Sequence, residues 1–185
     1  MPQTTTAEHT AADDHAVGVV DSTPAVDLLP VLTELSGSAG WARTVLGGRP
    51  YRSRVALHAA ARRVLTEQSD AEVLAAVDAH PPIGGGAGAG AGAEPVGEAS
   101  AREQSAAATD DAELARRLSE GQRRHAEHFG HAFLVCATGL TAREIVAELD
   151  RRIELGAAEE LACTREHLAR INALRLDQLL DTGTL

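Results

Sequence analysis

The stretch that decides the fold class is DDAELARRLSEGQRRHAEHFG, which runs from Asp110 to Gly130. Leu114 and Leu118 recur on one face of a helix and charged side chains occupy the opposite face, as expected for an amphipathic helix that packs against a core. Gly130 is the kind of residue at which such a helix ends. Related patterns on either side predict further helices over about 53–68, 69–80, 141–156 and from about 158 onwards.

Three finer expectations follow from the same patterns. A short helix that begins near Pro24 is expected to be interrupted at Pro30. Val55 is expected on the inner face of the helix over 53–68. Thr141 and Glu144 have the spacing of a capping box at the start of the helix over 141–156.

The composition supports an all-α fold. Hydrophobic residues make up 44% of the chain but aromatic residues only 2%, so the core must consist of small and aliphatic side chains, which suit close helix packing. A chain of 185 residues is long enough for one domain and short for two. We therefore predict a compact single-domain helical bundle over residues 24–185. Residues 1–23 show no apolar period and are predicted to form a disordered tail.

Charge and apolar patterning restrict the class of partner. The formal net charge of -10 argues against a nucleic-acid or anionic-membrane partner, because both favour a basic surface, whereas a small anionic ligand needs only a local group of Arg and His. No apolar run approaches the roughly 20 residues that span a bilayer, and the polar start lacks the pattern of a secretion signal. We expect a cytoplasmic protein in which Cys136 and Cys163 are buried reduced thiols, since their spacing matches no metal or redox motif.

A glycine-rich loop follows one of the predicted helices. Residues 84–97 are of low complexity, which predicts a mobile loop without packed structure of its own. His80 lies just before this loop, on the same helical face as Val73 and Val77, at a helix C-terminus where the carbonyl dipoles favour an imidazolium. The histidine is therefore either an imidazole that meets a ligand at the mouth of the loop, or only a charge partner of the helix end.

The far end of the loop carries a carboxylate. Ser100 and Glu103 have the spacing of a capping box, in which each side chain binds a main-chain amide at the start of a helix. A helix N-terminus also presents amides to an anion, and Gln104 adds a further polar group for a heterocyclic ligand. Glu103 is thus either a helix cap or a carboxylate that positions a substrate. Farther along, the apolar run AFLVCA at residues 132–137 is too short for a helix and predicts a buried extended segment.

The spacing of three histidines suggests a metal site. His125, His128 and His131 recur every three residues, and imidazoles one turn apart share a helix face. Gly130 interrupts the helix before the third histidine, however, and no carboxylate completes a recognised ligand set. A solvated helix end is the favoured interpretation, and we predict no metal site here.

Four blocks of the sequence together resemble the OHCU decarboxylase family, which decarboxylates 2-oxo-4-hydroxy-4-carboxy-5-ureidoimidazoline. The likeness covers about residues 28–180, and although each block is weak by itself, their order and spacing are specific. The blocks are HPPIG at 80–84, SAREQ at 100–104, FGHAFLVCATG at 129–139 and INALRL at 171–176.

The resemblance implies an all-helical, usually homodimeric enzyme that forms (S)-allantoin in urate degradation and needs no cofactor. His80 corresponds to the catalytic histidine, which we take to be the proton donor, and Glu103 is expected to position the substrate. Arg175, in the matching Arg-Leu pair of the last helix, is a weaker candidate for a substrate contact. The implied substrate contacts are Pro81, Ser100, Ala101, Arg102, Gln104, Phe133, Leu134, Val135, Cys136 and Ala137. The alternatives are a non-catalytic helical module for ligand binding or interaction, and a histidine-dependent metal protein.

Overall fold

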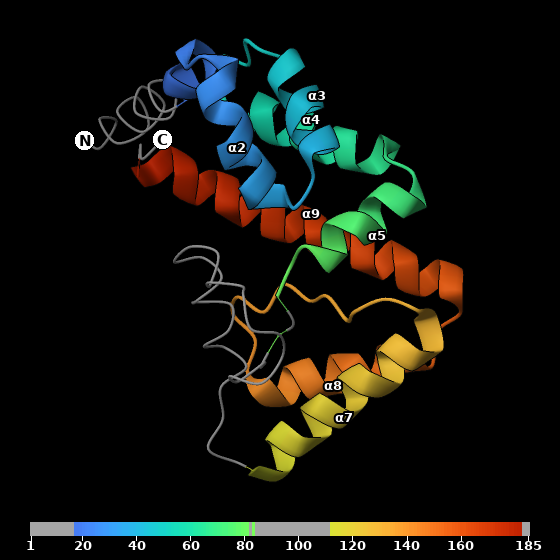
Figure 1. Ribbon diagram of the computed structural model, residues 1–185. Coiled ribbons are helices and arrows are strands. Elements are labelled where there is room, and N and C mark those ends of the chain that lie inside the picture. Colours follow the sequence, from blue (N-terminus) through green and yellow to red (C-terminus); the bar gives the residue numbers. More distant parts are fainter. Residues whose placement is uncertain (1–16, 82, 84–111, 183–185) are drawn as a thin grey trace, which may run out of the picture. The chain divides into compact units, whose positions relative to one another are not determined.

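The computed structural model describes residues 17–81, 83 and 112–182, and this part of the chain is helical without strands (Figure 1). The all-α prediction is therefore confirmed. A short helical stretch at residues 17–22 comes first. The helices that follow are α2 (Ala25–Ser36), α3 (Ala39–Gly47), α4 (Arg54–Glu67), α5 (Asp70–Asp78), α7 (Ala112–Phe129), α8 (Ala142–Ile153) and α9 (Ala157–Thr182). None of these described helices is long and apolar enough to cross a membrane.

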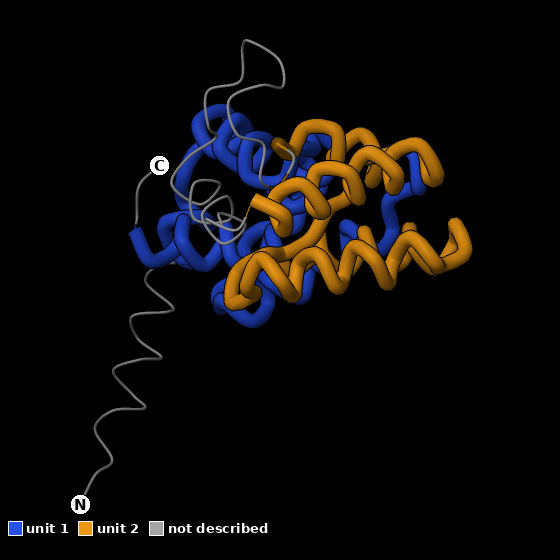
Figure 2. Tube along the Cα trace, turned by 90° about the horizontal axis from the view of Figure 1, so that it is seen from below, with its two compact units in different colours: residues 1–72, 171–185 blue, residues 73–170 orange. Residues whose placement is uncertain are grey.

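The chain divides into two compact units, shown in different colours in Figure 2. Unit 1 combines the chain up to residue 72 with the part from residue 171 onwards, and unit 2 comprises residues 73–170. Helix α9 therefore contributes its first half to unit 2 and its second half to unit 1.

Unit 1 has an apolar core built around a single tryptophan. Trp41 of α3 is 1% exposed, and its indole Nε1 donates a hydrogen bond of 2.9 Å to the carbonyl oxygen of Ala61 in α4. Leu28 and Leu32 of α2 and Leu57 of α4 are equally buried. A buried indole N–H needs such an acceptor, so the ring is fixed by both packing and a directed bond.

The folded part of unit 1 begins earlier than the sequence predicted. Val17 and Val20 of the short helical stretch are buried, although residues 17–23 were expected to belong to a disordered tail. The Asp21 carboxylate accepts hydrogen bonds from the main-chain N–H of Tyr51, and Arg49 donates to the carbonyl of Val20. These partners lie about thirty residues away, so a local search for an apolar period does not detect them. Residues 1–16 lie outside the described residues.

Two local expectations in unit 1 are wrong. Helix α2 continues through Pro30, where an interruption was predicted. The missing N–H of a proline leaves the carbonyl four residues earlier without its helical donor, and Val26 at that position is exposed, so water can replace the donor. In α4, Val55 is 79% exposed although it was expected inside, because the helix buries the face that contains Leu57 and Val64.

Unit 2 packs α7 and α8 side by side (Figure 1). The close approach depends on Gly121, because a Cβ atom there would lie 2.6 Å from Cδ2 of Leu149. Helix α8 begins with the capping box that the sequence predicted, formed by Thr141 and Glu144. Helix α7 ends at Gly130 as expected, with a φ of 78° that favours glycine.

Candidate functional site

His80 is held at the C-terminal end of α5 by the main chain of that helix. Its imidazole Nδ1 lies 2.7 Å from the carbonyl oxygen of Ala76, and the main-chain N–H of His80 donates to the carbonyl of Val77 at 2.9 Å. The side chain is buried, on the same face as Val73 and Val77, as the periodicity predicted. Since a carbonyl only accepts, Nδ1 carries a proton, and Nε2 is the ring nitrogen that can gain or lose one.

The turn after His80 is tied to the core of unit 2. Ile83 is 7% exposed, and its carbonyl oxygen accepts a hydrogen bond of 2.6 Å from Nε2 of Gln122 in α7. Ile83 belongs to the same apolar cluster as Phe133, Val135 and Ala137. The first and third of the sequence blocks, about fifty residues apart in the chain, therefore share one core.

The extended segment at residues 132–137 is buried, as the sequence predicted, and two polar side chains bind its main chain. Arg152 of α8 donates from Nη1 to the carbonyl oxygen of Leu134 at 2.7 Å. The N–H of Cys136 donates to Nδ1 of His167 in α9 at 3.2 Å. Because a buried segment outside helices has no regular main-chain partners, such side-chain partners are what its polar groups require.

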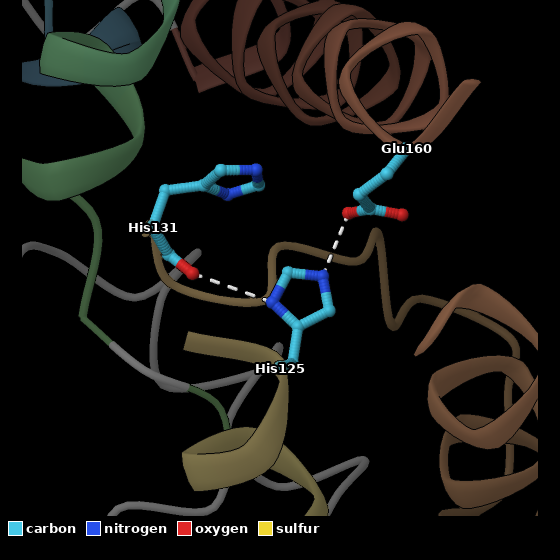
Figure 3. A group of neighbouring side chains, drawn as sticks. All are labelled: His125, His131 and Glu160. Atoms are coloured by element: carbon cyan, nitrogen blue, oxygen red, sulfur yellow. Dashed lines mark hydrogen bonds and ion pairs between the residues drawn. The ribbon is translucent and has the colours of Figure 1, made fainter. Parts of the chain in front are cut away.

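Arg152 belongs to a fully buried network of charged and polar side chains. Its guanidinium donates from Nε to Oε2 of Glu160 at 2.7 Å, forms a short contact from Nη2 to Oε1, and donates to the hydroxyl of Thr164. His125 of α7 also binds this carboxylate, with Nε2 2.8 Å from Oε1 (Figure 3). Burial raises the pKa of Glu160, but hydrogen bonds from His125 and Arg152 outweigh burial and lower it to about 2.

The predicted solvated helix end is wrong for two of the three histidines. His125 and His131 are buried and only His128 is exposed, because His125 continues the stripe of Leu114, Leu118 and Gly121 on the inner face of α7. The ring of His125 lies between the main-chain oxygen of His131 and the Glu160 carboxylate (Figure 3).

His125, His131 and Glu160 are candidate metal ligands. One ligand atom from each of His125, His131 and Glu160 lies within 4.8 Å of the other two. Arg152, however, already engages both carboxylate oxygens of Glu160, so a cation would have to displace a guanidinium from a buried carboxylate. The geometry therefore favours an internal ion network over a metal centre.

A groove of about 710 Å³ lies between α8 and α9. Its lining includes Glu148, Arg151, Cys163, His167 and Arg170. His167 thus borders the groove on one side and binds the extended segment with Nδ1. Cys136 and Cys163 are not joined in a disulfide, and both are of intermediate exposure, less buried than predicted.

Comparison with known proteins identifies the family of this chain. Residues 21–177 match the sequence profile described as OHCU decarboxylase. The chain belongs to the OHCU decarboxylase family. The resemblance found in the four sequence blocks is confirmed.

Individual relatives agree with this family. A solved structure described as OHCU decarboxylase in the presence of (S)-allantoin is 26% identical, with a TM-score of 0.68 over 80% of this chain and 96% of that one. A structure described as (S)-allantoin synthase, at 19% identity and a TM-score of 0.64, covers 88% of this chain and 53% of that one and shows the shared fold. The uric acid degradation bifunctional protein TTL of Arabidopsis thaliana is 26% identical over 143 residues, which are 77% of this chain and 44% of that protein. The chain thus spans less than half the length of this curated relative.

The predicted site residues of this family member are only partly described. His80, Pro81 and the segment from Phe133 to Ala137 lie in unit 2, whereas Arg175 lies in unit 1, where it is buried and donates to the carbonyl oxygen of Leu35 at 2.9 Å. Glu103 falls outside the described residues, as does the rest of its block: Ser100, Ala101, Arg102 and Gln104.

The sequence reasoning did not identify Arg152, Glu160 or His167. A signal was present for Arg152, which follows Ile145 and Leu149 at helical spacing on the inner face of α8. An arginine at such a position is normally assigned to solvent, so its burial emerges only when its carboxylate partner is known to be near.

Proposed function

We propose that this protein decarboxylates 2-oxo-4-hydroxy-4-carboxy-5-ureidoimidazoline to (S)-allantoin without a cofactor, as a step of urate catabolism. Family membership supports the reaction, and the names of two relatives refer to uric acid degradation and allantoin synthesis. The observation that carries the proposal for this chain is the shared core of Ile83 with Phe133, Val135 and Ala137. It joins the turn after the proposed proton donor to the segment proposed to contact the substrate.

In the proposed chemistry, the ring imine of the substrate is itself the electron sink, so the protein must mainly supply a proton donor. The bond from the substrate's ring carbon to its carboxylate breaks, carbon dioxide leaves, and the electron pair moves into the adjacent ring imine. The neighbouring carbon, which bears the ureido group, then takes a proton on one face while the hydroxyl beside it becomes a carbonyl, and this step sets the configuration of allantoin. His80 suits this step because its Nδ1–H is fixed on Ala76 and its titrating nitrogen is Nε2. The helix C-terminus favours the protonated form that donates.

Glu103 is proposed to hold the hydroxyl and ureido groups of the substrate, together with its neighbours in residues 100–104. Pro81 and the main chain of residues 133–137 are proposed as further substrate contacts, with Arg175 as a weaker candidate. A homodimer and a cytoplasmic location stay predictions of the sequence. A non-catalytic helical binding module is the competing function.

The deciding experiment is the substitution His80→Asn, with His128→Ala as the control at an exposed histidine of α7. Asparagine can keep the hydrogen bond to Ala76 with its amide N–H but has no group at the place of Nε2. We expect H80N to fold normally and to lose at least about 100-fold in turnover, which is the usual contribution of a general acid to the rate. Fresh substrate is generated from urate by urate oxidase and hydroxyisourate hydrolase, and circular dichroism follows the chirality of allantoin.

The wild-type protein and H128A should yield optically active (S)-allantoin, whereas H80N should leave only the racemic product of spontaneous decay. Equal turnover by H80N and the wild-type protein would reduce His80 to a helix cap. A wild-type protein that produces no excess of one enantiomer would favour the non-catalytic module.

A further inference from the structure

The extended segment of unit 2 is bound along one edge at alternate residues. In an extended chain, the polar main-chain groups of residues two apart point to the same side. The carbonyl of Leu134 and the N–H of Cys136 therefore face one edge together, and Arg152 and His167 bind them there at 2.7 and 3.2 Å. By the same alternation, the main-chain groups of Val135 are expected to face the opposite edge.

Arg152 is unusually constrained for a long side chain. It is fully buried, and both Glu160 and Thr164 accept hydrogen bonds from it. Its guanidinium carbon also lies 4.8 Å from the centroid of the Phe133 ring. The bond to Leu134 is thus made by a group with no freedom to follow the main chain, so the ion network determines where that carbonyl lies.

His167 is matched to its task as an acceptor. Since Nδ1 accepts the N–H of Cys136, the proton of the neutral ring is on Nε2, which lies 3.6 Å from Oε1 of Glu148. Burial lowers the pKa of His167, the charges of Arg152 and Arg170 lower it further, and Glu148 opposes them. The imidazole is therefore neutral at neutral pH, and Nδ1 keeps the lone pair that the bond to Cys136 requires.

We propose that Arg152 and His167 are positioning residues, which together fix the main chain from Phe133 to Ala137 so that the groups of Val135 present a rigid edge to the substrate. This inference rests on the proposed function. A flat ureido ring offers amide-like donors and acceptors that match one extended main-chain edge, and a rigid edge avoids the cost of ordering on binding. The effect of the two residues should therefore appear mainly in KM.

The test compares His167→Asn with His167→Leu. The side-chain oxygen of asparagine lies near the place of Nδ1 and accepts the Cys136 N–H without ever becoming charged, whereas leucine fills the space without an acceptor. We expect H167L to raise KM about fivefold, the equivalent of one hydrogen bond, with kcat changed less. H167N should stay within about twofold of the wild-type KM. A fall in thermal stability with an unchanged KM in both variants would make His167 merely structural and overturn the proposal.

The pH dependence of KM separates His167 from the proposed proton donor. Protonation of Nδ1 below the ordinary pKa of 6.5 removes the acceptor, so the wild-type KM should rise as the pH falls, while that of H167N should lack this rise. The charged groups that face this ring are Glu148 and Arg152 of α8 and Arg170 of α9, and they are unchanged in both proteins. Identical acid limbs in the wild-type protein and H167N would contradict the proposal.

For Arg152, the double substitution Arg152→Met with Glu160→Met separates position from stability. Removing both charges together restores apolar packing and is often neutral for stability, but the Leu134 carbonyl still loses its donor. We expect a folded protein whose KM is raised at least about fivefold. A stable double variant with the wild-type KM would show that the ion network has no positioning role.

Hydrogen exchange at the Cys136 amide tests the hydrogen bond to His167 independently of catalysis. Exchange should be faster in H167L than in the wild-type protein and should stay slow in H167N. If the wild-type protein showed no turnover, the proposed function would fail, but this measurement would still test whether His167 holds the main chain at Cys136. Equal exchange in all three proteins would instead overturn the positioning role itself.

Discussion

The two units differ in where a central arginine–carboxylate pair lies. Among the described residues of unit 1, the ion pairs of Arg54 of α4 lie near solvent: Arg54 is 2.8 Å from Asp177 and 2.6 Å from Asp181 of α9, with side chains that are 21 to 65% exposed. Unit 2 buries Arg152 and Glu160 completely. The interior of unit 1, around Trp41, is apolar by contrast.

This difference follows from the kind of main chain that each unit contains. A buried ion pair is costly to desolvate, and an apolar pair of similar volume is often at least as stable. In unit 1, helices satisfy most of the main-chain groups, Trp41 needs only the carbonyl of Ala61, and the buried Arg175 donates to the carbonyl of Leu35 at the end of α2. In unit 2, a non-helical segment passes through the core, and the carbonyl of Leu134 needs a donor that cannot leave. The buried pair is best explained by the segment that it binds.

The comparison predicts very unequal costs for two matched substitutions. Arg152→Met should reduce the free energy of unfolding by about 3–5 kcal/mol, because it leaves a buried carboxylate and a buried carbonyl with fewer partners. Arg54→Met in unit 1 should cost no more than about 1 kcal/mol, since its pairs are partly exposed. Urea titration followed by circular dichroism measures both. Similar losses in the two variants would show that burial does not distinguish the two ion pairs.

Acid should weaken unit 2 through Glu160. The pKa of Glu160 is lowered from 4.5 to about 2, so the folded protein binds this proton less readily than the unfolded chain. The stabilisation is fully present above pH 4.5 and is lost as the pH falls towards 2, with a total of roughly 3 kcal/mol.

Glu160→Gln removes this titration and serves as the reference. The wild-type protein should be more stable than E160Q at pH 6, and the difference should shrink steadily as the pH falls below 4.5. Urea unfolding at several pH values gives both curves. A difference that stays constant with pH would mean that Glu160 is not the group responsible.

The sequence predicted those features that depend on local pattern. The amphipathic helix that ends at Gly130, the inward position of His80 and the extended segment at residues 132–137 all follow from spacing within one element, and the structure has them. The family followed from the order of four blocks. The role of Glu103 stays a prediction, because that residue lies outside the described part of the chain.

Features that depend on distant partners were not predictable in the same way. Arg152 is buried because Glu160, eight residues later, returns beside it after the turn between α8 and α9. The short helix that contains Val17 packs through contacts with a loop near Tyr51. His125 could have been predicted as buried from the stripe of Leu114 and Leu118, but its histidine neighbours suggested solvent or a metal instead.

Helix packing gives the smallest contrast between the units, and two glycines test it. In Gly121→Ala of unit 2, the new Cβ would lie 2.6 Å from Cδ2 and 3.2 Å from Cγ of Leu149, a side chain with no exposure and thus little room to move. Overpacking of about 1–3 kcal/mol exceeds the gain in helix propensity of about 1 kcal/mol, so we expect a net loss of about 1 kcal/mol. Gly47→Ala at the end of α3 meets no atom within 4 Å and should stabilise unit 1 by about 0.5 kcal/mol. Thermal unfolding of both variants should therefore give shifts of opposite sign. A stabilised G121A would mean that Leu149 can rotate away, and that α7 and α8 are packed less tightly than the helices around Trp41.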